Sequence, residues 1–343
     1  MITLLLTVAV VLTTGLVLLL ATIIVRRALA DRRRRREDSL RPAIEIAIVE
    51  YLAADEPGPP SIPAGREARD LVLLVALETA AELQGGERSR LVALLEHLGI
   101  VDEIGLMLAS RRPRVRRTAA ETLRQIGSEA STRRLSIGLH DEDLDTRVTC
   151  AAALAELADQ DLLPSVIAVA DADAVARPGA VAATLVTLGR THPAAIGETL
   201  APRMSIELRR LGAAVAGELR LFEHVELLRE AMTSSDDELV ARAARGLGMI
   251  GDDGAVDALL ALVGAEGRAW FVRLAATEAL GAIGDPRAIE ALERELTSDI
   301  WLLQEKAAAA LRLLGSGGDR ALRRAMGSAL PNVSDQAKVA LAR

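Results

Sequence analysis

The chain contains two different patterns of hydrophobic and polar positions. Residues 2–25 form one uninterrupted apolar run of 24 residues without a charged residue or a proline. As a helix, this run would rise about 36 Å, which exceeds the roughly 30 Å thickness of a bilayer's hydrocarbon core. After residue 66, apolar positions instead recur three and four residues apart, in segments separated by glycine and proline. The first pattern predicts a membrane-spanning helix, and the second predicts a series of amphipathic helices.

The apolar run also resembles a secretory signal, because Ala28-Leu29-Ala30 has the small-x-small form of a cleavage site. Three features oppose cleavage. No basic residue precedes the run, the run is longer than the roughly 7 to 15 residues of a signal, and Arg26 and Arg27 come before the supposed site. We therefore predict that residues 1–25 are an uncleaved, single-pass anchor.

A run of arginines follows the predicted anchor: Arg26, Arg27, Arg32, Arg33, Arg34, Arg35 and Arg36. Basic residues beside a spanning helix stay on the cytoplasmic side, so we expect the N-terminus outside the cell membrane and residues 26–343 in the cytoplasm. Seven arginines against three acidic residues give residues 1–38 a charge of +4, which leaves −11 of the total of −7 for the remaining residues. An acidic main domain does not favour nucleic-acid binding, which depends on spread Lys and Arg contacts. Contact of the run with anionic lipid headgroups is a further possibility.

Composition favours an all-α domain in a reducing compartment. Only five aromatic residues occur among 343, whereas alanine and leucine dominate. Such a core allows helices to approach closely and does not suit a β-sandwich or barrel. Cys150 is the single cysteine, which excludes an intramolecular disulfide and fits the cytoplasm.

The segment Val272 to Asp299, "VRLAATEALGAIGDPRAIEALERELTSD", predicts a helical hairpin. Its first helix ends at Gly284, and Pro286 begins the second, where the missing N–H of proline costs nothing. A large residue, Leu280, marks the buried ridge of the first helix.

Aligning the chain to itself on Leu280 shows that the hairpin repeats. Ridge positions fall 31 residues apart, with one interval of 33 and a first, looser interval of 28. Fixed-period similarity over some 250 residues indicates a solenoid, in which each hairpin buries its face against the next. The ridge residues are Leu95, Leu123, Leu154, Leu185, Ala216, Leu247, Leu280 and Leu311.

Two other positions recur with this period. A glycine stands four residues after the ridge at Gly99, Gly127, Gly189, Gly251, Gly284 and Gly315, with Ala158 and Arg220 as exceptions. An arginine stands seven residues before the ridge at Arg88, Arg116, Arg147, Arg209 and Arg273.

With Ala-Ala between the arginine and the ridge and Asp-Pro-Arg-Ala after the glycine, "VRLAATEALGAIGDPRAIEAL" resembles HEAT repeats, particularly the short bacterial kind also found in phycobilisome lyases. The resemblance covers about residues 86–343 and specifies architecture far better than function. The whole layout resembles membrane-anchored bacterial HEAT-repeat proteins, some of which are associated with envelope glycosyltransferases. It implies an all-α, HEAT-like α-solenoid of about seven to eight hairpins behind one N-terminal transmembrane helix.

We divide the chain accordingly. After the anchor, residues 26–38 form a basic juxtamembrane segment, and residues 39–65 hold an amphipathic helix and a linker rich in proline and glycine. Residues 66–343 form the solenoid, whose first helix serves as an N-terminal cap because solenoid ends must be covered.

The sequence provides little for catalysis. The four histidines are isolated, no phosphate-binding glycine motif occurs, and Cys150 aligns with small positions inside first helices. We therefore expect no enzyme activity, no metal and no cofactor. The alternative, allowed by the lyase resemblance, is a HEAT-type lyase or another enzyme that acts on a bound small molecule.

Candidate partner-binding residues come from two periodic positions. Arg116, Arg147, Arg209 and Arg273 form either a basic stripe for a carboxylate-rich partner or an internal ladder, in which Asp143 would pair with Arg147. Trp270, followed by Phe271, and Trp301 each lie ten residues before a ridge leucine and open a helix, where they either pack on the next turn or form a docking patch.

The apolar segment Leu162 to Ala170, "LLPSVIAVA", is a second candidate surface, because a two-layer solenoid leaves one face of such a helix exposed. Together these features predict a non-catalytic scaffold that holds a protein partner, itself membrane-associated, at the cytoplasmic face.

Overall fold

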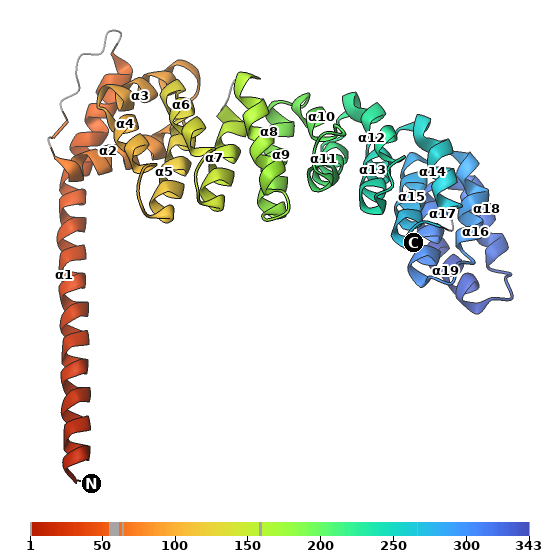
Figure 1. The fold of residues 1–343 in the computed structure, drawn as a ribbon, viewed down its shortest axis with the longest axis horizontal. Helices are drawn as coiled ribbons and strands as arrows, with labels where there is room; N and C mark the ends of the chain where they lie inside the picture. The colour runs from red at the N-terminus through yellow and green to blue at the C-terminus, as the bar shows by residue number, and fades with distance from the viewer. Residues whose placement is uncertain (1, 55–61, 64, 158–159, 266, 343) are drawn as a thin grey trace. The chain divides into compact units, whose positions relative to one another are not determined.

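The computed structural model describes residues 2–54, 62–63, 65–157, 160–265 and 267–342, without the side chains of residues 2–15, 17, 18 and 28–34. All regular elements in these ranges are α-helices or short 3-10 helices (Figure 1). The chain divides into two compact units. The first comprises Met1–Leu106 with Gln125–Ala130, and the second comprises Met107–Arg124 with Ser131–Arg343.

The first unit is built on one long helix. Helix α1 (Ile2–Ala53) continues without a break through the arginine run and past Pro42, although the sequence alone suggested a new helix near residue 41. Ile44 and Ile48 of α1, which lie four residues apart, are almost completely buried, as suits the predicted amphipathic helix. They pack where α1 meets α2 (Arg66–Ala80) and α3 (Gly85–His97), which are followed by α4 (Ile100–Met107).

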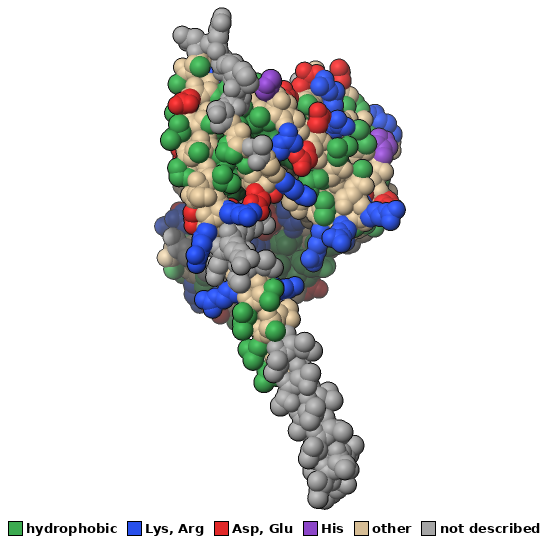
Figure 2. Space-filling view, turned by 90° about the vertical axis from the view of Figure 1, so that its left-hand side faces the viewer, with side chains coloured by type: hydrophobic (Ala, Val, Ile, Leu, Met, Phe, Trp, Pro, Cys, Tyr) green, Lys and Arg blue, Asp and Glu red, His purple; other side chains and the backbone are tan. Residues whose placement is uncertain are grey.

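Polar contacts fix α1 to its neighbours. Arg41 Nη2 lies 2.5 Å from Glu78 Oε2 of α2, and Arg90 Nη1 of α3 donates to the Leu52 carbonyl at 2.8 Å. In Figure 2, exposed apolar side chains of α1 are followed by basic ones nearer the packed part of this unit.

Among the residues whose side chains are described, no helix is long and apolar enough to span a membrane. Most side chains of the predicted anchor, and those of Arg32, Arg33 and Arg34, lie outside the described residues.

The second unit consists of helical hairpins, followed by α19 (Pro331–Ala342). The hairpins are α5 (Pro113–Ile126) with α6 (Glu129–Gly138), α7 (Leu144–Leu157) with α8 (Leu163–Asp173), α9 (Pro178–Thr191) with α10 (Ala195–Thr199), α11 (Ile206–Glu218) with α12 (Val225–Ala231), α13 (Asp237–Ile250) with α14 (Val256–Val263), α15 (Trp270–Ile283) with α16 (Ile289–Glu295), and α17 (Trp301–Leu313) with α18 (Gly315–Ala325). Short 3-10 turns precede α8, α12, α14 and α16.

These hairpins form two layers. The first helices α7, α9, α11, α13, α15 and α17 pack on one another in chain order, and the second helices cover them. In Figure 1, α9, α11 and α13 lie on the lower side of this unit, and α8, α10 and α12 lie on its upper side. This is the α-solenoid that the repeat predicted.

The ridge residues form the core. All eight predicted ridge positions are at most 2% exposed, which confirms the register of the repeat. The positions are Leu95 in the first unit and Leu123, Leu154, Leu185, Ala216, Leu247, Leu280 and Leu311 in the second.

The glycine after the ridge ends the first helix in most repeats. Gly251 and Gly284 both have φ of +84°, a left-handed conformation that costs glycine little. Gly189 is different: it lies inside α9, which continues to Thr191. At the corresponding place after α11, Arg220 takes the left-handed conformation, with φ of +52°. Ala158 lies outside the described residues.

Candidate functional site

The starts of the first helices lie side by side along one edge of the second unit. Helices α11, α13, α15 and α17 each begin ten residues before a ridge residue. Successive starts touch: Arg177, just before α9, pairs with Asp145 of α7 at 2.7 Å, and Arg268, just before α15, pairs with Asp237 of α13 at 2.8 Å. We call this surface the start edge and define it by Val175, Ile206, Asp237, Trp270 and Trp301, one residue from each of five consecutive repeats.

Both tryptophans of the start edge are solvent-accessible. Trp270 is 46% exposed and Trp301 is 62% exposed, and each is the first residue of its helix. Trp270 packs edge-on against Phe271, with ring centroids 6.1 Å apart, and is the partner of no other described ring. The two tryptophans occupy equivalent positions of adjacent, packed helices, and their role in partner binding stays a prediction.

Sequence reasoning missed two further residues of the same edge. Val175 is 78% exposed and Ile206 is 39% exposed, and they stand ten residues before Leu185 and Ala216. The signal was present, because the spacing that singled out the tryptophans also selects these positions.

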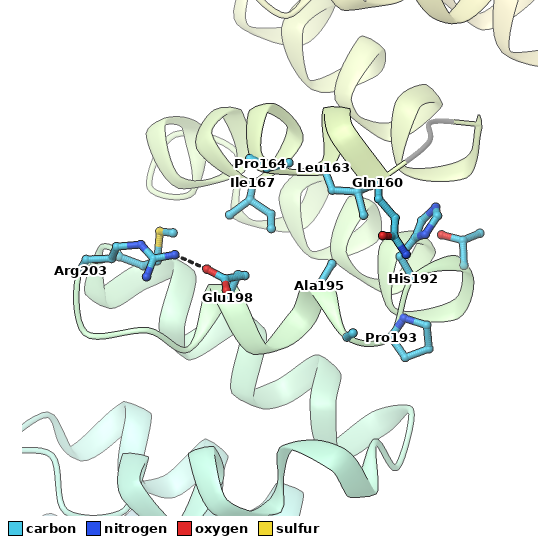
Figure 3. Close-up of a pocket in the computed structure, with 12 residues that line it drawn as sticks. Gln160, Leu163, Pro164, Ile167, His192, Pro193, Ala195, Glu198 and Arg203 are labelled. Atoms are coloured by element: carbon cyan, nitrogen blue, oxygen red, sulfur yellow. Dashed lines mark hydrogen bonds and ion pairs between the residues drawn. The ribbon is translucent and has the colours of Figure 1, made fainter. Parts of the chain in front are cut away.

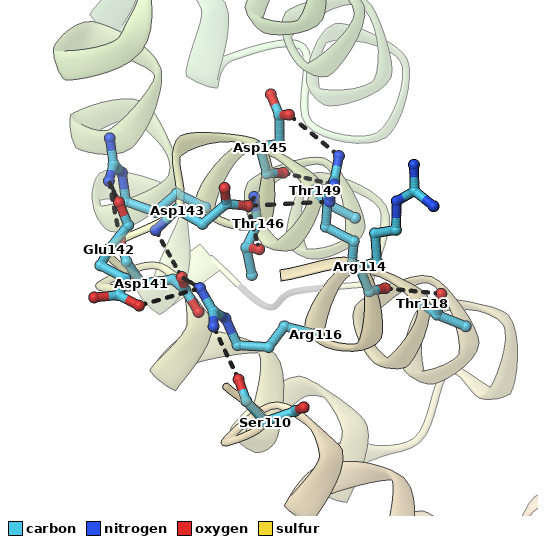
Figure 4. Close-up of polar contacts among 12 residues, drawn as sticks. Ser110, Arg114, Arg116, Thr118, Asp141, Glu142, Asp143, Asp145, Thr146 and Thr149 are labelled. Carbon is cyan, nitrogen blue, oxygen red and sulfur yellow. Dashed lines mark hydrogen bonds and ion pairs between the residues drawn. The ribbon is translucent and has the colours of Figure 1, made fainter. Parts of the chain in front are cut away.

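The predicted arginine column is engaged in internal contacts. Arg116, only 5% exposed, donates to Asp141 Oδ1 at 2.7 Å and to the Ser110 carbonyl at 2.9 Å (Figure 4). Arg147 binds both carboxylate oxygens of Asp173 at 2.7 and 3.1 Å.

The same holds farther along the column. Arg273 donates to both oxygens of the buried Glu295 at 2.8 and 2.9 Å. Arg209 donates to the Leu200 carbonyl, and Arg88 donates to the Ala80 and Gln125 carbonyls. These contacts join each first helix to elements beside it, so binding of a partner's carboxylate would require the internal contacts to open.

Asp143 is not the partner of Arg147, contrary to the sequence-based expectation. Its carboxylate accepts from the backbone N–H and the hydroxyl of Thr146 at 2.9 and 2.7 Å and so caps α7 (Figure 4). The hydrogen bond from the Thr146 hydroxyl lowers the pKa of Asp143. Asp173, at the end of the second helix α8, takes the pairing role instead.

An apolar pocket of about 790 Å³ lies between α8 and the segment containing α10 (Figure 3). Leu163, Pro164 and Ile167 of α8 face Pro193, Ala195 and Met204 across it. The ion pair of Glu198 and Arg203 lies at one end, and Gln160 and His192 lie at the other.

The segment "LLPSVIAVA" was expected to leave one face of its helix exposed, and the structure places part of that face in the pocket. Val166, Ile167 and Ala170 are buried, whereas Pro164 is exposed and lines the pocket. The pocket lies beside α10, which has only five residues, whereas α8 has eleven. Pro193 and Pro202 bracket α10 in the sequence, but its five-residue extent was not predicted.

The single cysteine and one of the histidines, residue types that often take part in catalysis, are buried. Burial raises the pKa of Cys150 to about 12, which keeps the thiol protonated near neutral pH. His224 is 6% exposed, and its Nε2 lies 2.8 Å from the Pro193 carbonyl beside the pocket. Within the described parts of the chain, no three His, Cys, Asp or Glu side chains are grouped so that they could hold a metal ion.

The sequence model for HEAT repeats matches residues 193–270 and again residues 225–312, from α10 to α17. Residues 193–312 are similar to HEAT repeats. The matched region includes both tryptophans of the start edge, and the comparison with curated proteins found no match.

Solved α-solenoids are similar to the chain. Kap121p bound to Ste12p has 11% identity and a TM-score of 0.51, with 92% of this chain and 43% of that chain covered. Kap121p bound to Nup53p has 13% identity and a TM-score of 0.50, with 81% and 37% covered. This chain therefore spans about two-fifths of the length of Kap121p, and at these identities the likeness shows the fold alone.

A third similar structure is human deoxyhypusine hydroxylase, with 19% identity, a TM-score of 0.31, and 72% and 98% of the two chains covered. A likeness at that TM-score carries no argument about this chain.

Proposed function

We propose that this protein is a membrane-anchored, non-catalytic scaffold whose HEAT repeats hold a protein partner at the cytoplasmic face of the cell membrane. The partner is membrane-associated, and one class that fits is an envelope enzyme such as a glycosyltransferase, with this chain as its accessory subunit. The observation that carries the proposal is the exposure of Trp270 and Trp301 at equivalent positions of adjacent repeats.

Tryptophan is costly to expose and is over-represented among the residues that dominate interface energies. A solenoid presents such side chains on one continuous surface, because each repeat adds an equivalent position beside the last. Kap121p, which has a similar fold, is described bound to Ste12p and to Nup53p, and we extend that use of a solenoid to this chain.

The membrane part of the proposal rests on residues 2–25 and on the arginines that follow. The described apolar side chains between Leu16 and Val25 are at least 49% exposed on α1, with no protein surface covering them. Arg26, Arg27, Arg35 and Arg36 are exposed on the same continuous helix, as suits the cytoplasmic end of an anchor.

We assign the arginine column an indirect part in partner binding. Arg116, Arg147 and Arg273 each hold a carboxylate from a neighbouring element and so fix the relative positions of the helices that carry the start edge. Arg209 does the same through a backbone carbonyl.

The test is crosslinked capture of the tagged, full-length protein from native membranes, with partners identified by mass spectrometry. A version without residues 1–38 and a version with Trp270→Ala and Trp301→Ala are compared with the unaltered chain. Leu313→Ala, at a residue 67% exposed near the other end of α17, is the matched control. One dominant membrane partner, lost from both test versions and retained by the control, would support the scaffold. Equal capture by all four versions would refute it.

The pocket beside α10 favours a second candidate function, a HEAT-type lyase or another enzyme that acts on a bound small molecule. Its volume and largely apolar lining are typical of small-molecule sites. Ala194→Phe, at an exposed lining residue, would fill the pocket without touching the start edge. A pigment or metabolite that co-purifies with the unaltered protein and is lost from this variant would favour the second function.

A further inference from the structure

The first helices differ in how their starts are capped. Helices α11 and α13 begin with side-chain caps: Ser205 accepts from the Leu208 N–H at 3.2 Å, and Asp236 accepts from the Leu239 N–H at 2.8 Å. Helices α15 and α17 instead follow Ala269 and Ile300, which provide no side-chain acceptor. Among α11, α13, α15 and α17, the two helices that carry the tryptophans are therefore the ones that begin without a side-chain cap.

Backbone donors consequently remain available beside both tryptophans. The N–H groups of Trp270, Phe271, Trp301 and Leu302 have no hydrogen-bond acceptor among the described residues. The first N–H groups of a helix always need partners from outside the helix, and here only solvent or a ligand can supply them. A ligand suited to this edge therefore carries exposed acceptors as well as apolar groups.

The acidic side chains around Trp301 are unpaired among the described residues. Trp301 and Glu305, one helical turn apart on α17, line a groove of about 340 Å³ together with Val339 of α19. The carboxylates of Glu305 and of the nearby exposed Asp299 have no ion pair or hydrogen bond with any described residue. Arg312, which also lines the groove, is already paired with Asp319 at 2.9 Å.

Elsewhere along the edge the charges are neutralised. Arg268 pairs with Asp237, and this hydrogen bond lowers the pKa of Asp237. Arg177 pairs with Asp145, and Arg203 pairs with Glu198. An indole face flanked by unpaired carboxylates attracts a cation, so charge complementarity at Trp301 selects a Lys or Arg side chain.

The spacing of the start edge selects the conformation of the ligand. Packed helices lie about 8 to 10 Å apart, and an extended segment in the polyproline II conformation advances about 9 Å in three residues, with side chains three residues apart on the same side. A peptide helix would need about seven residues for the same advance, and its carbonyls would be bonded internally and could not accept from the free N–H groups. Only an extended segment matches both the spacing and the donors.

We infer that the start edge binds an extended segment of a protein partner. Its apolar side chains, spaced by three residues or by six across Asp237, contact Val175, Ile206, Trp270 and Trp301, and a Lys or Arg at the Trp301 end lies over the indole beside Glu305. Its carbonyls accept from the free N–H groups at the starts of α15 and α17. This inference rests on the proposed scaffold function and specifies the chemistry of the partner.

The test is selection of random 15-residue peptides displayed on phage against the full-length protein in nanodiscs. We expect enrichment of peptides that have apolar residues three positions apart and a basic residue at one end. In titrations of a selected synthetic peptide, Trp270→Ala with Trp301→Ala should abolish binding. Glu305→Gln should weaken binding about fivefold, as expected for loss of one charge-assisted contact. Leu313→Ala should leave binding unchanged.

Urea unfolding of every variant serves as the control for correct folding. Should the double tryptophan variant lose stability, Trp301→Phe and Ile206→Ser replace it, and each must still weaken binding measurably. Apolar spacing of seven residues, selection of acidic peptides, no enrichment, or equal binding to the start-edge variants would each overturn the inference. If capture from membranes still depends on the tryptophans, such a result would refute binding of an extended segment but not the proposed scaffold function.

Discussion

The repeats from α13 to α17 and the repeat of α9 and α10 pack in opposite ways. A Cβ placed on Gly248 of α13 would lie 2.6 Å from the Ala279 Cα of α15, and one on Gly281 would lie 2.7 Å from the Ala310 Cα of α17. Adjacent first helices there are in backbone contact, which leaves no space between them. Beside α10, by contrast, the short second helix leaves a pocket of about 790 Å³. Glycines of the irregular repeat are also closely approached, but by side chains: a Cβ on Gly189 of α9 would lie 2.5 Å from Leu219 Cδ1. Small residues in register thus bring the backbones of the regular first helices together, whereas a pocket remains beside the short second helix.

The largest test of this comparison is a glycine substitution in each region. Gly281→Val would force α15 and α17 apart, because the new side chain meets backbone and cannot be accommodated by a rotamer change. We expect a loss of about 3 kcal/mol or more. Gly179→Ala, in the first turn of α9, meets nothing within 4 Å and should stabilise by about 0.5 kcal/mol through helix propensity. Midpoints of urea unfolding measure both, and a loss of stability in Gly179→Ala as large as in Gly281→Val would contradict the expected difference between the two positions.

Arginines of the column stand in α7, next to the irregular repeat, and in α15, within the regular repeats, whereas α9 has Pro178 at this position. Removal of either arginine should cost about the same. Arg147→Leu would leave Asp173, 3% exposed, as a buried charge without its partner, and Arg273→Leu would do the same to Glu295, 4% exposed. Each change should lower the free energy of unfolding by about 3 kcal/mol.

The control for this prediction is the double change Arg147→Leu with Asp173→Leu, which removes both charges and should recover most of the loss. If the arginines bind a partner directly, the stable double variant will lose capture from membranes. If the arginines only make contacts within the protein, the double variant will retain capture of the partner.

A smaller effect is expected where the regular and irregular parts meet. After α11, Arg220 stands in the left-handed position, and Leu221 and Arg220 donate to the Ala216 and Gly217 carbonyls at 2.9 and 3.0 Å. This is the Schellman ending that glycine makes at lower cost. Arg220→Gly should therefore stabilise the protein by about 1 kcal/mol.

The reciprocal change sharpens the comparison. Gly251→Arg places the same side chain at the equivalent position after α13, where φ is +84°. It should destabilise the protein by about 1 kcal/mol. Thermal midpoints that move in the same direction for both variants would contradict the assignment of the two positions as equivalent.

The regular repeats could be predicted because their register appears in the sequence. Leu247, Leu280 and Leu311 follow one another at 33 and 31 residues, at or close to the period, and the buried ridge follows from that spacing. The identity of each arginine's partner could not be predicted, because Asp173 lies 26 residues after Arg147 and its position depends on how the second helix packs.

The pocket could not be predicted either. Pro193 and Pro202 bracket residues 194–201 and so limit the length of this second helix, but the sequence does not show that only Ala195–Thr199 are helical or that a cavity remains beside them. The start edge is intermediate: its exposure needed the structure, but its spacing was already present at Val175 and Ile206.

The smallest prediction compares the same substitution in the two regions. Thr277 of α15 is fully buried, and its hydroxyl has no hydrogen-bond partner, at a position where the other repeats from α5 to α17 have alanine. Thr184 of α9 is 1% exposed, and its hydroxyl donates to the Ala180 carbonyl at 3.0 Å. Loss of an unsatisfied buried hydroxyl outweighs loss of one methyl group, so Thr277→Ala should stabilise by about 0.5 kcal/mol. Thr184→Ala removes a satisfied hydroxyl and should destabilise by about 1 kcal/mol. Urea midpoints that shift in opposite directions would establish that hydroxyl satisfaction, and not burial alone, sets the sign. A loss of stability in both variants would show instead that the Thr277 methyl group fills space that alanine leaves empty.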